Sequence, residues 1–256
     1  MRAKVRNVRL TIEYDGSKFH GWQTQKGHRT VQEELTEGIL KATGERVSLI
    51  GASRTDAGVH ALGQVANFRT STRIPVDRLP HAINFYLPDD VSIRGARIVP
   101  DSFHSRFCAV RKTYRYALIA SFTPRPLERR GAVLVRGLLN PAAMRAAANA
   151  LEGRHDFRAF GSSGGRVKTT VRTVESIRIR WRGERVEIDV TGDGFLYNMV
   201  RCIAGTLLRA GQGRIDAAEV ARILRQGDRK AAGPVAPAHA LCLLKVVTRA
   251  RPRPGA

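Results

Sequence analysis

The stretch from Gly51 to Phe68, with the sequence GASRTDAGVHALGQVANF, constrains the fold of this chain more than any other. Residues 47–50, just before it, are rich in β-branched side chains and predict a strand. A second apolar run at residues 64–68 predicts another strand. Gly51 and Gly58 bracket the loop between these two strands. Glycine permits the backbone angles that a sharp reversal needs. The pattern therefore predicts two strands joined by a tight loop.

Three polar residues of this loop, Arg54, Asp56 and His60, are candidates for chemistry. Because Arg54 and Asp56 are two residues apart, their side chains leave the same face of an extended chain. A guanidinium beside a carboxylate keeps the carboxylate ionised, as a nucleophile or a general base requires. The structural alternative is that Asp56 caps a turn and Arg54 is its surface partner, since Asp and Gly are common turn residues.

The charge of the chain points to a class of partner. Its 256 residues include 44 Lys and Arg against 22 Asp and Glu, which leaves a formal net charge of +22. Most of the basic residues are Arg, whose planar guanidinium binds phosphate in a bidentate manner. A field of this sign and size favours a polyanionic partner. A ribosomal-type protein or a generally adhesive basic protein would carry the same charge, so charge alone does not separate these classes.

The cysteines and the apolar pattern indicate in which cellular compartment the protein resides. Cys108, Cys202 and Cys242 are odd in number, widely spaced and without a CxxC pair, which predicts reduced thiols rather than a zinc site or a disulfide framework. Residues 1–16 alternate charged and apolar side chains and lack the apolar core of a signal peptide. No stretch has the apolar length of a membrane span. We expect a soluble, cytoplasmic protein.

Hydrophobic periodicity predicts the same order of elements in both halves of the chain, β-α-β-β-α-β, which is that of a ferredoxin-like unit. In the first half, Thr30 and Glu33 predict a capping box at the start of a helix. The predicted elements of the first half are strands at 8–14, 47–50, 64–68 and 91–99 and helices at 30–44 and 75–86. Those of the second half are strands at 113–120, 173–181, 185–191 and 241–247 and helices at 141–151, 195–208 and 216–224. Asn140 and Asp216 are predicted to cap two of these helices, and Gly183 is predicted to lie in a hairpin turn at 182–184.

The predicted fold is α+β, with two ferredoxin-like units whose mainly antiparallel sheets flank a central basic cleft, and ligand sites often occupy such junctions. We expect an N-terminal unit at residues 1–104, a C-terminal unit at 105–249 and a disordered basic tail at 250–256. The basic, Gly/Ser-rich segment 162–170 predicts either an RNA-contacting loop or a flexible linker.

Four strings of the chain occur in the same order in a known family. They are YDGSKFHGWQTQ at 14–25, RTDAGVHA at 54–61, RKTYRY at 111–116 and GDGFLYNMVRCIAGTLL at 192–208. On these strings the chain resembles the TruA family of tRNA pseudouridine synthases over nearly its whole length. One departure is Ser53, where most members of the family carry Gly before the Arg.

The resemblance implies roles for five residues. Asp56 is implied as the nucleophile, with Arg54 as a second catalytic residue. Tyr114 is implied to stack on the target uracil, while Arg201 and His60 belong to the substrate-binding set. From the residues alone, Tyr114 and Tyr116 on one strand face are also consistent with a buried structural ring, and Arg201 on an apolar helix with an exposed surface charge.

The resemblance also implies the reaction. The family converts uridine to pseudouridine at positions 38, 39 and 40 of the tRNA anticodon stem-loop, and a homodimer holds one tRNA across its subunits. The N1–C1′ bond breaks, the uracil rotates and C5 bonds to C1′, so neither a cofactor nor a metal is implied. Whether Asp56 attacks C1′ or C6 stays open.

Two other function classes fit part of the sequence. A non-catalytic RNA-binding protein with RRM-like sheets would also be basic, but it should cluster aromatic side chains on its central strands, and here they are sparse. A metal-dependent nuclease would group Asp, Glu or His ligands, whereas the seven His residues are scattered. Neither alternative explains the four strings.

Overall fold

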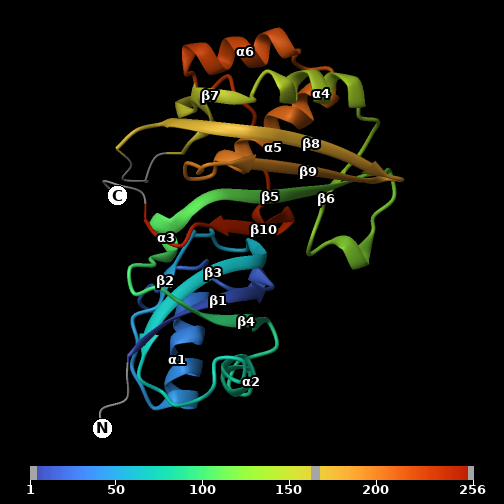
Figure 1. Ribbon diagram of the computed structural model, residues 1–256. Coiled ribbons are helices and arrows are strands. Elements are labelled where there is room, and N and C mark those ends of the chain that lie inside the picture. Colours follow the sequence, from blue (N-terminus) through green and yellow to red (C-terminus); the bar gives the residue numbers. More distant parts are fainter. Residues whose placement is uncertain (1–4, 163–167, 253–256) are drawn as a thin grey trace. The chain divides into compact units, whose positions relative to one another are not determined.

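The computed structural model describes residues 5–162 and 168–252, and the chain divides into two compact units (Figure 1). Unit 1 contains residues 5–110 and 243–252, and unit 2 contains residues 111–242. The loop predicted at 162–170 and the tail predicted at 250–256 both lie partly outside the described residues. No helix among the described residues is long and apolar enough to cross a membrane.

Unit 1 is built on an antiparallel sheet in which β1 lies between β3 and β4, and β2 pairs with β3. The elements follow one another in the order predicted from the sequence. They are β1 (Arg6–Tyr14), η1 (Gly16–Lys18), α1 (Val31–Thr43), β2 (Ile50–Gly51), β3 (His60–Thr70), α2 (Leu79–Asn84), β4 (Val91–Val99) and α3 (Ser105–Cys108). Helices α1 and α2 lie on one side of this sheet (Figure 1).

The strand predicted at 8–14, where apolar residues alternate with polar ones, is confirmed as β1. Val8, Leu10 and Ile12 are fully buried, and the residues between them are half-buried. Since successive side chains point to opposite faces of a strand, these three share one face of the sheet. In register, β1 runs from Arg6 opposite Thr70 of β3 to Tyr14 opposite Ala61. Tyr14 therefore ends β1 next to the first residues of β3.

The capping box predicted at the start of α1 is wrong. Thr30 is the N-cap residue, but its side chain makes no capping hydrogen bond, and its buried hydroxyl has no hydrogen-bond partner among the described residues. The first two N–H groups of the helix, those of Val31 and Gln32, instead donate to the carbonyl oxygens of Gly21 (3.2 Å) and Trp22 (3.0 Å). A neighbouring backbone thus satisfies the donors that a capping side chain usually satisfies.

The strands of unit 2 pair in the order β5-β9-β8-β7 and are mostly antiparallel, with the short β6 parallel to β5. Helix α4 packs against α5, α6 and β8. The elements are β5 (Ala109–Ala120), η2 (Pro126–Glu128), β6 (Val133–Val135), α4 (Pro141–Asn149), β7 (Gly153–Asp156), η3 (Arg158–Phe160), β8 (Val171–Arg182), β9 (Arg185–Gly192), α5 (Met199–Gly211), α6 (Ala217–Gln226), η4 (Ala238–Ala240) and β10 (Leu241–Thr248). From residue 243 onward, β10 belongs to unit 1.

Several local predictions for unit 2 are confirmed. Asn140 accepts hydrogen bonds from the first N–H groups of α4, and Asp216 caps α6 in the same way. Gly183, with φ 59°, occupies the turn between β8 and β9. The helix predicted from residue 195 begins only at Met199, because Asn198 adopts a left-handed conformation with φ 62° that cannot continue a helix.

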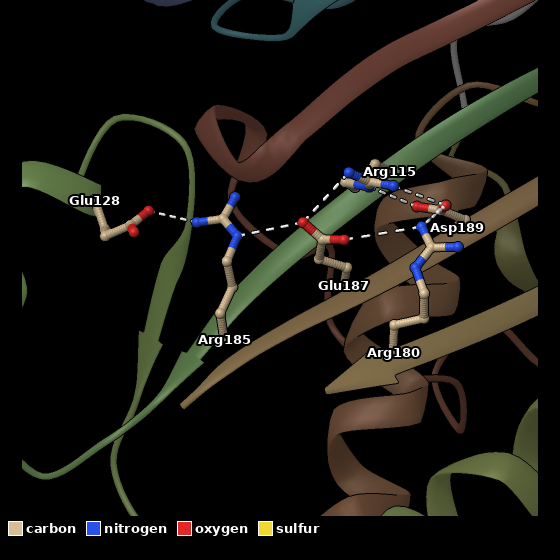
Figure 2. A network of polar contacts seen from close by, with 6 residues as sticks. All are labelled: Arg115, Glu128, Arg180, Arg185, Glu187 and Asp189. Carbon is tan, nitrogen blue, oxygen red and sulfur yellow. Dashed lines mark hydrogen bonds and ion pairs between the residues drawn. The ribbon is translucent and has the colours of Figure 1, made fainter. Parts of the chain in front are cut away.

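Strand β9 is buried on both faces, with apolar side chains on one face and charged side chains on the other. Val186, Ile188 and Val190 are fully buried on one face of the sheet. Glu187 and Asp189 lie on the opposite face and are buried as well. Figure 2 shows that arginines surround these two carboxylates, so the second face is a network of charges.

The arginines of this network come from β9 itself and from the two strands beside it. Arg115, opposite Asp189 in the register of β5 and β9, donates to it through Nε (2.7 Å) and a terminal nitrogen (3.0 Å). Its other terminal nitrogen lies 3.2 Å from Glu187. Arg180 of β8 also donates to Asp189, and Arg185 lies 3.4 Å from Glu187. Such bidentate, charge-assisted bonds are stronger than neutral ones.

The network changes the titration of its members. Burial alone would raise the pKa of Asp189, but the hydrogen bonds and charges of Arg115 and Arg180 outweigh it and hold that pKa below its ordinary value. The hydrogen bond to Asp189 raises the pKa of Arg115 in turn. Because the folded pKa of Asp189 lies below the unfolded one, its contribution to stability is present above the unfolded pKa and is lost as the pH falls through the folded pKa.

We expect Asp189→Asn to lower the free energy of unfolding at neutral pH by about 3 kcal/mol, because two partly buried arginines then face a buried, neutral amide. Urea denaturation measures this. The control Glu175→Gln removes a carboxylate whose ion pair with Arg111 is partly exposed, and it should cost less than about 1 kcal/mol. The difference between wild type and Asp189→Asn should shrink in acid. Equal losses of unfolding free energy in Asp189→Asn and Glu175→Gln at neutral pH would contradict a stabilising role for the network around Asp189.

Candidate active site

The candidate site in unit 1 is the loop of residues 52–59, between β2 and β3. Strand β3 begins at His60, four residues earlier than predicted, so the loop is short. Hydrogen bonds hold its beginning: the Ala52 N–H donates to the Val65 carbonyl oxygen (2.8 Å), and the Gln64 amide donates to the Ser53 carbonyl oxygen (2.8 Å). Because Gln64 is fully buried, little water competes for the second bond.

A tight turn follows Asp56. The Val59 N–H donates to the Asp56 carbonyl oxygen (3.1 Å), and Gly58 between them has φ 79°. The Gly58 N–H in turn donates to the carbonyl oxygen of Phe19 (3.2 Å). Asp56 is half-buried, whereas Arg54 is exposed. The backbone on both sides of the carboxylate is thus fixed, and the guanidinium two residues earlier contacts solvent.

The segment of residues 14–22, which begins at the last residue of β1, packs directly against this loop. The Trp22 N–H donates to the Thr55 carbonyl oxygen (3.0 Å). Gly21 has φ 85°, and a Cβ at this position would lie 2.5 Å from the same oxygen. Only glycine accommodates both the backbone angle and the close approach.

The turn after β1 holds the other end of the loop. The Gly16 N–H donates to Nδ1 of His60 (3.1 Å), and a carboxylate oxygen of Asp15 lies 3.0 Å from the same nitrogen. A Cβ at Gly16 would lie 2.0 Å from the Val59 carbonyl oxygen. The structure therefore places His60 against the turn at residues 15–16, where the loop becomes β3.

A buried pair of hydroxyl groups joins the end of β1 to the loop. The Tyr14 hydroxyl and the Thr55 hydroxyl share a hydrogen bond of 2.7 Å, and both residues are buried. The Tyr14 ring meets Phe19 edge-to-face, with the ring centroids 6.4 Å apart. The residue immediately before Asp56 is therefore held through both its side chain and its carbonyl group.

Tyr114 and Tyr116 lie on β5 in unit 2, and both rings are buried. Tyr114 meets Phe195 edge-to-face, with the ring centroids 5.4 Å apart. Tyr116 is completely buried, and its hydroxyl donates to the Pro237 carbonyl oxygen (3.0 Å). Burial raises the pKa of the Tyr116 phenol. The contacts of Tyr116 are therefore those of a core residue.

Arg201 lies in the first turn of α5 and is half-buried. Its Nε donates to the carbonyl oxygen of Ala236 (2.6 Å), and a terminal nitrogen donates to the side-chain oxygen of Asn198 (2.7 Å). The Ala236 N–H donates back to the Arg201 carbonyl oxygen (3.3 Å). The guanidinium is thus held in place by residues of its own unit.

The structure brings together three of the five predicted site residues. Arg54 and Asp56 lie on the loop of unit 1 and His60 is the first residue of β3, directly after it, whereas Tyr114 and Arg201 belong to unit 2. Within residues 5–162 and 168–252, no three His, Cys, Asp or Glu side chains are grouped so that they could hold a metal ion.

The sequence did not reveal the contact between Tyr14 and Thr55, which holds the loop in place. The period of β1 predicts Tyr14 only as a core residue, and Thr55 is one letter of a longer string. The signal that could have identified this contact is the pair of glycines, Gly16 and Gly21, in the segment after the strand. Glycines outside a regular element often mark a close approach of two backbones.

Comparison with known proteins identifies the family. A family model described as tRNA pseudouridine synthase matches residues 10–108 and 147–247. A protein of Thermoanaerobacter sp., named tRNA pseudouridine synthase A, is 48% identical over 243 residues, which cover 95% of this chain and 100% of that protein. The Acetivibrio thermocellus protein of the same name is also 48% identical, over 94% of this chain and 99% of its own.

A Clostridium perfringens protein named tRNA pseudouridine synthase A 2 is 44% identical over 94% of this chain and 99% of its own. Among solved structures, the archaeal box H/ACA sRNP Nop10-Cbf5 complex matches with a TM-score of 0.38 and 12% identity, over 88% of this chain and 60% of that one. This structural likeness is too distant to support a conclusion. The chain belongs to the tRNA pseudouridine synthase family, on the family model and the sequence relatives.

We expect Gly21→Ala to destabilise the protein more than Gly27→Ala does. Both positions have positive φ (85° and 77°), so each substitution should cost about 1–3 kcal/mol of backbone strain. At Gly27 a Cβ meets nothing within 4 Å, but at Gly21 it also collides with the Thr55 carbonyl oxygen. Urea denaturation of both variants measures the difference, which should be about 1–3 kcal/mol. Equal losses would show that the close approach does not constrain the loop.

Proposed function

We propose that the chain is a tRNA pseudouridine synthase that uses the Asp56 carboxylate as its nucleophile. The observation that carries the proposal is the setting of Asp56 in a chain of this family. It is half-buried, and its loop is bonded to β3 and to the segment after β1. An Asp that merely caps a turn needs no such support from a distant segment.

The proposed reaction is an isomerisation. The N1–C1′ glycosidic bond of uridine breaks, the uracil rotates, and its C5 bonds to C1′. The C5 proton leaves, and N1 takes up a proton, so the atoms balance without an oxidant or a hydrolytic water. Asp56 would form a covalent bond with either C1′ or C6 during this rearrangement.

The target uridine must leave the helical stack to reach a carboxylate, at a cost of about a few kcal/mol. Arg54, exposed two residues before Asp56, would contact the RNA and fill the space that the base leaves. Stacking on Tyr114 would return about 1–3 kcal/mol. Arg201 and His60 complete the proposed substrate-binding set.

The family resemblance extends this proposal. The substrate would be uridines 38, 39 and 40 in the anticodon stem-loop of cytoplasmic tRNA. Two ferredoxin-like units would flank a basic cleft, and a homodimer would hold the RNA. The net charge of +22 supports a polyanionic substrate of this kind.

We expect Asp56→Asn to abolish the release of tritium from C5 of uridine in tRNA, because Asn has nearly the same shape but no nucleophilic charge. The affinity for tRNA should persist or rise slightly, since a negative charge near phosphates is removed. The measurement pairs tritium release with a melting curve of the same variant.

The control for this variant is Asp77→Asn, which removes an exposed carboxylate near α2 and should leave activity unchanged. A turn-capping role for Asp56 predicts lower stability and an activity reduced only in proportion. A folded Asp56→Asn protein that turns over near the wild-type rate would falsify the assignment.

Substitutions of the two tyrosines on β5, Tyr114 and Tyr116, should have different effects. We expect Tyr114→Leu to lower the single-turnover rate of the folded protein by about tenfold to a hundredfold, through lost stacking on the base. Tyr116→Leu should instead lower the free energy of unfolding by about 3 kcal/mol, as truncation of a buried ring does, with little change in rate. Rates and urea denaturation of both variants test this, and the reverse pattern would exchange the two roles.

A further inference from the structure

The segment after β1 does more than connect two elements. Two backbone N–H groups, those of Trp22 and Gly58, donate across the boundary between residues 14–22 and the loop that carries Asp56. A third, that of Gly16, donates to His60, the first residue of β3. The Trp22 indole covers Gly51, where a Cβ would lie 2.5 Å from the ring. The segment therefore fixes the path of the loop along its length.

One residue of the loop, Thr55, is held through two of its groups. The carbonyl oxygen of Thr55 accepts from the Trp22 N–H, and its hydroxyl shares the 2.7 Å hydrogen bond with the Tyr14 hydroxyl. The side chain and the carbonyl group of one residue are thus fixed to opposite ends of the supporting segment. Rotation about the Thr55 backbone would break one of the two bonds, and that backbone leads directly into Asp56.

We propose that Tyr14 and Thr55 are positioning residues for the isomerisation, acting through Asp56. This inference rests on the proposed role of Asp56 as nucleophile. The hydroxyl pair fixes the direction in which the Asp56 carboxylate leaves the loop before RNA binds. A nucleophile must approach its target atom in one direction, and a displacement of about 1 Å can cost about a hundredfold in rate.

A purely structural role makes a different prediction about stability and rate. Removing one hydroxyl from a buried pair leaves the other without this partner, so either single variant should lose stability. Replacing both partners with apolar groups of the same shape can be nearly neutral. The double variant Tyr14→Phe/Thr55→Val should therefore regain stability. Under a structural role its rate would recover too, whereas under a positioning role it would stay low.

The experiment measures tritium release from tRNA in single turnover, at saturating enzyme and well below the melting temperature, together with tRNA affinity and a melting curve. We expect Tyr14→Phe, Thr55→Val and the double variant each to lower the rate constant by about tenfold to a hundredfold, with tRNA affinity unchanged within about twofold. The double variant should be no slower than either single one, because all three remove the same bond.

Two further variants sharpen the result. Thr55→Ser keeps the hydroxyl and should restore a rate close to that of wild type. Thr191→Val removes a hydroxyl from a similar pair, which Thr113 and Thr191 form at 3.0 Å in unit 2, and it should leave the rate unchanged. If the double variant does not fold, the rates of Thr55→Val and Thr55→Ser decide the question alone.

Asp56→Asn, measured in parallel, distinguishes a failure of the positioning role of Tyr14 and Thr55 from a failure of the nucleophile role of Asp56. If Asp56→Asn is inactive and the hydroxyl variants react at the wild-type rate, the positioning role is overturned and the proposed function stands. If Asp56→Asn is active, Asp56 is not the nucleophile, and the positioning role, which acts through Asp56, fails with it.

Discussion

The candidate site depends on the close approach of two backbones, that of residues 14–22 and that of the loop 52–59. At Gly21 a side chain would collide with the Thr55 carbonyl oxygen, and at Gly16 it would collide with that of Val59. Once the backbones are this close, N–H groups of one segment reach carbonyl oxygens of the other, and a half-buried carboxylate can be held in a short loop. The same segment also supplies the carbonyl oxygens that cap α1, so the helix, the strand and the loop share one support.

Charge is handled differently in unit 2. The chain carries twice as many basic as acidic residues, yet Glu187 and Asp189 are buried on β9. They allow arginines to lie close together on the neighbouring strands, because each guanidinium near a carboxylate is spared part of the repulsion of the others. Such a network fixes some of the positive charge within the sheet, while arginines elsewhere, Arg54 among them, stay exposed to a polyanionic partner.

The sequence was a good guide where a local pattern decides the structure. The alternation in β1, the Asn140 cap and the Gly183 turn are set by residues close together in the chain, and all three predictions were correct. The capping box at Thr30 failed because a distant backbone, at Gly21 and Trp22, satisfied the helix donors first. For the same reason the sequence contained no sign of the contact between Tyr14 and Thr55, which depends on how β1 and β3 pair.

We have proposed that this chain forms pseudouridine in the anticodon stem-loop of tRNA. The most direct test is to map pseudouridines in the tRNA of cells that lack the protein, with and without the wild-type chain restored. The account predicts that pseudouridine at positions 38, 39 and 40 is lost and then regained, while pseudouridines elsewhere in the tRNA persist. An unchanged map, or a loss confined to other positions, would contradict it.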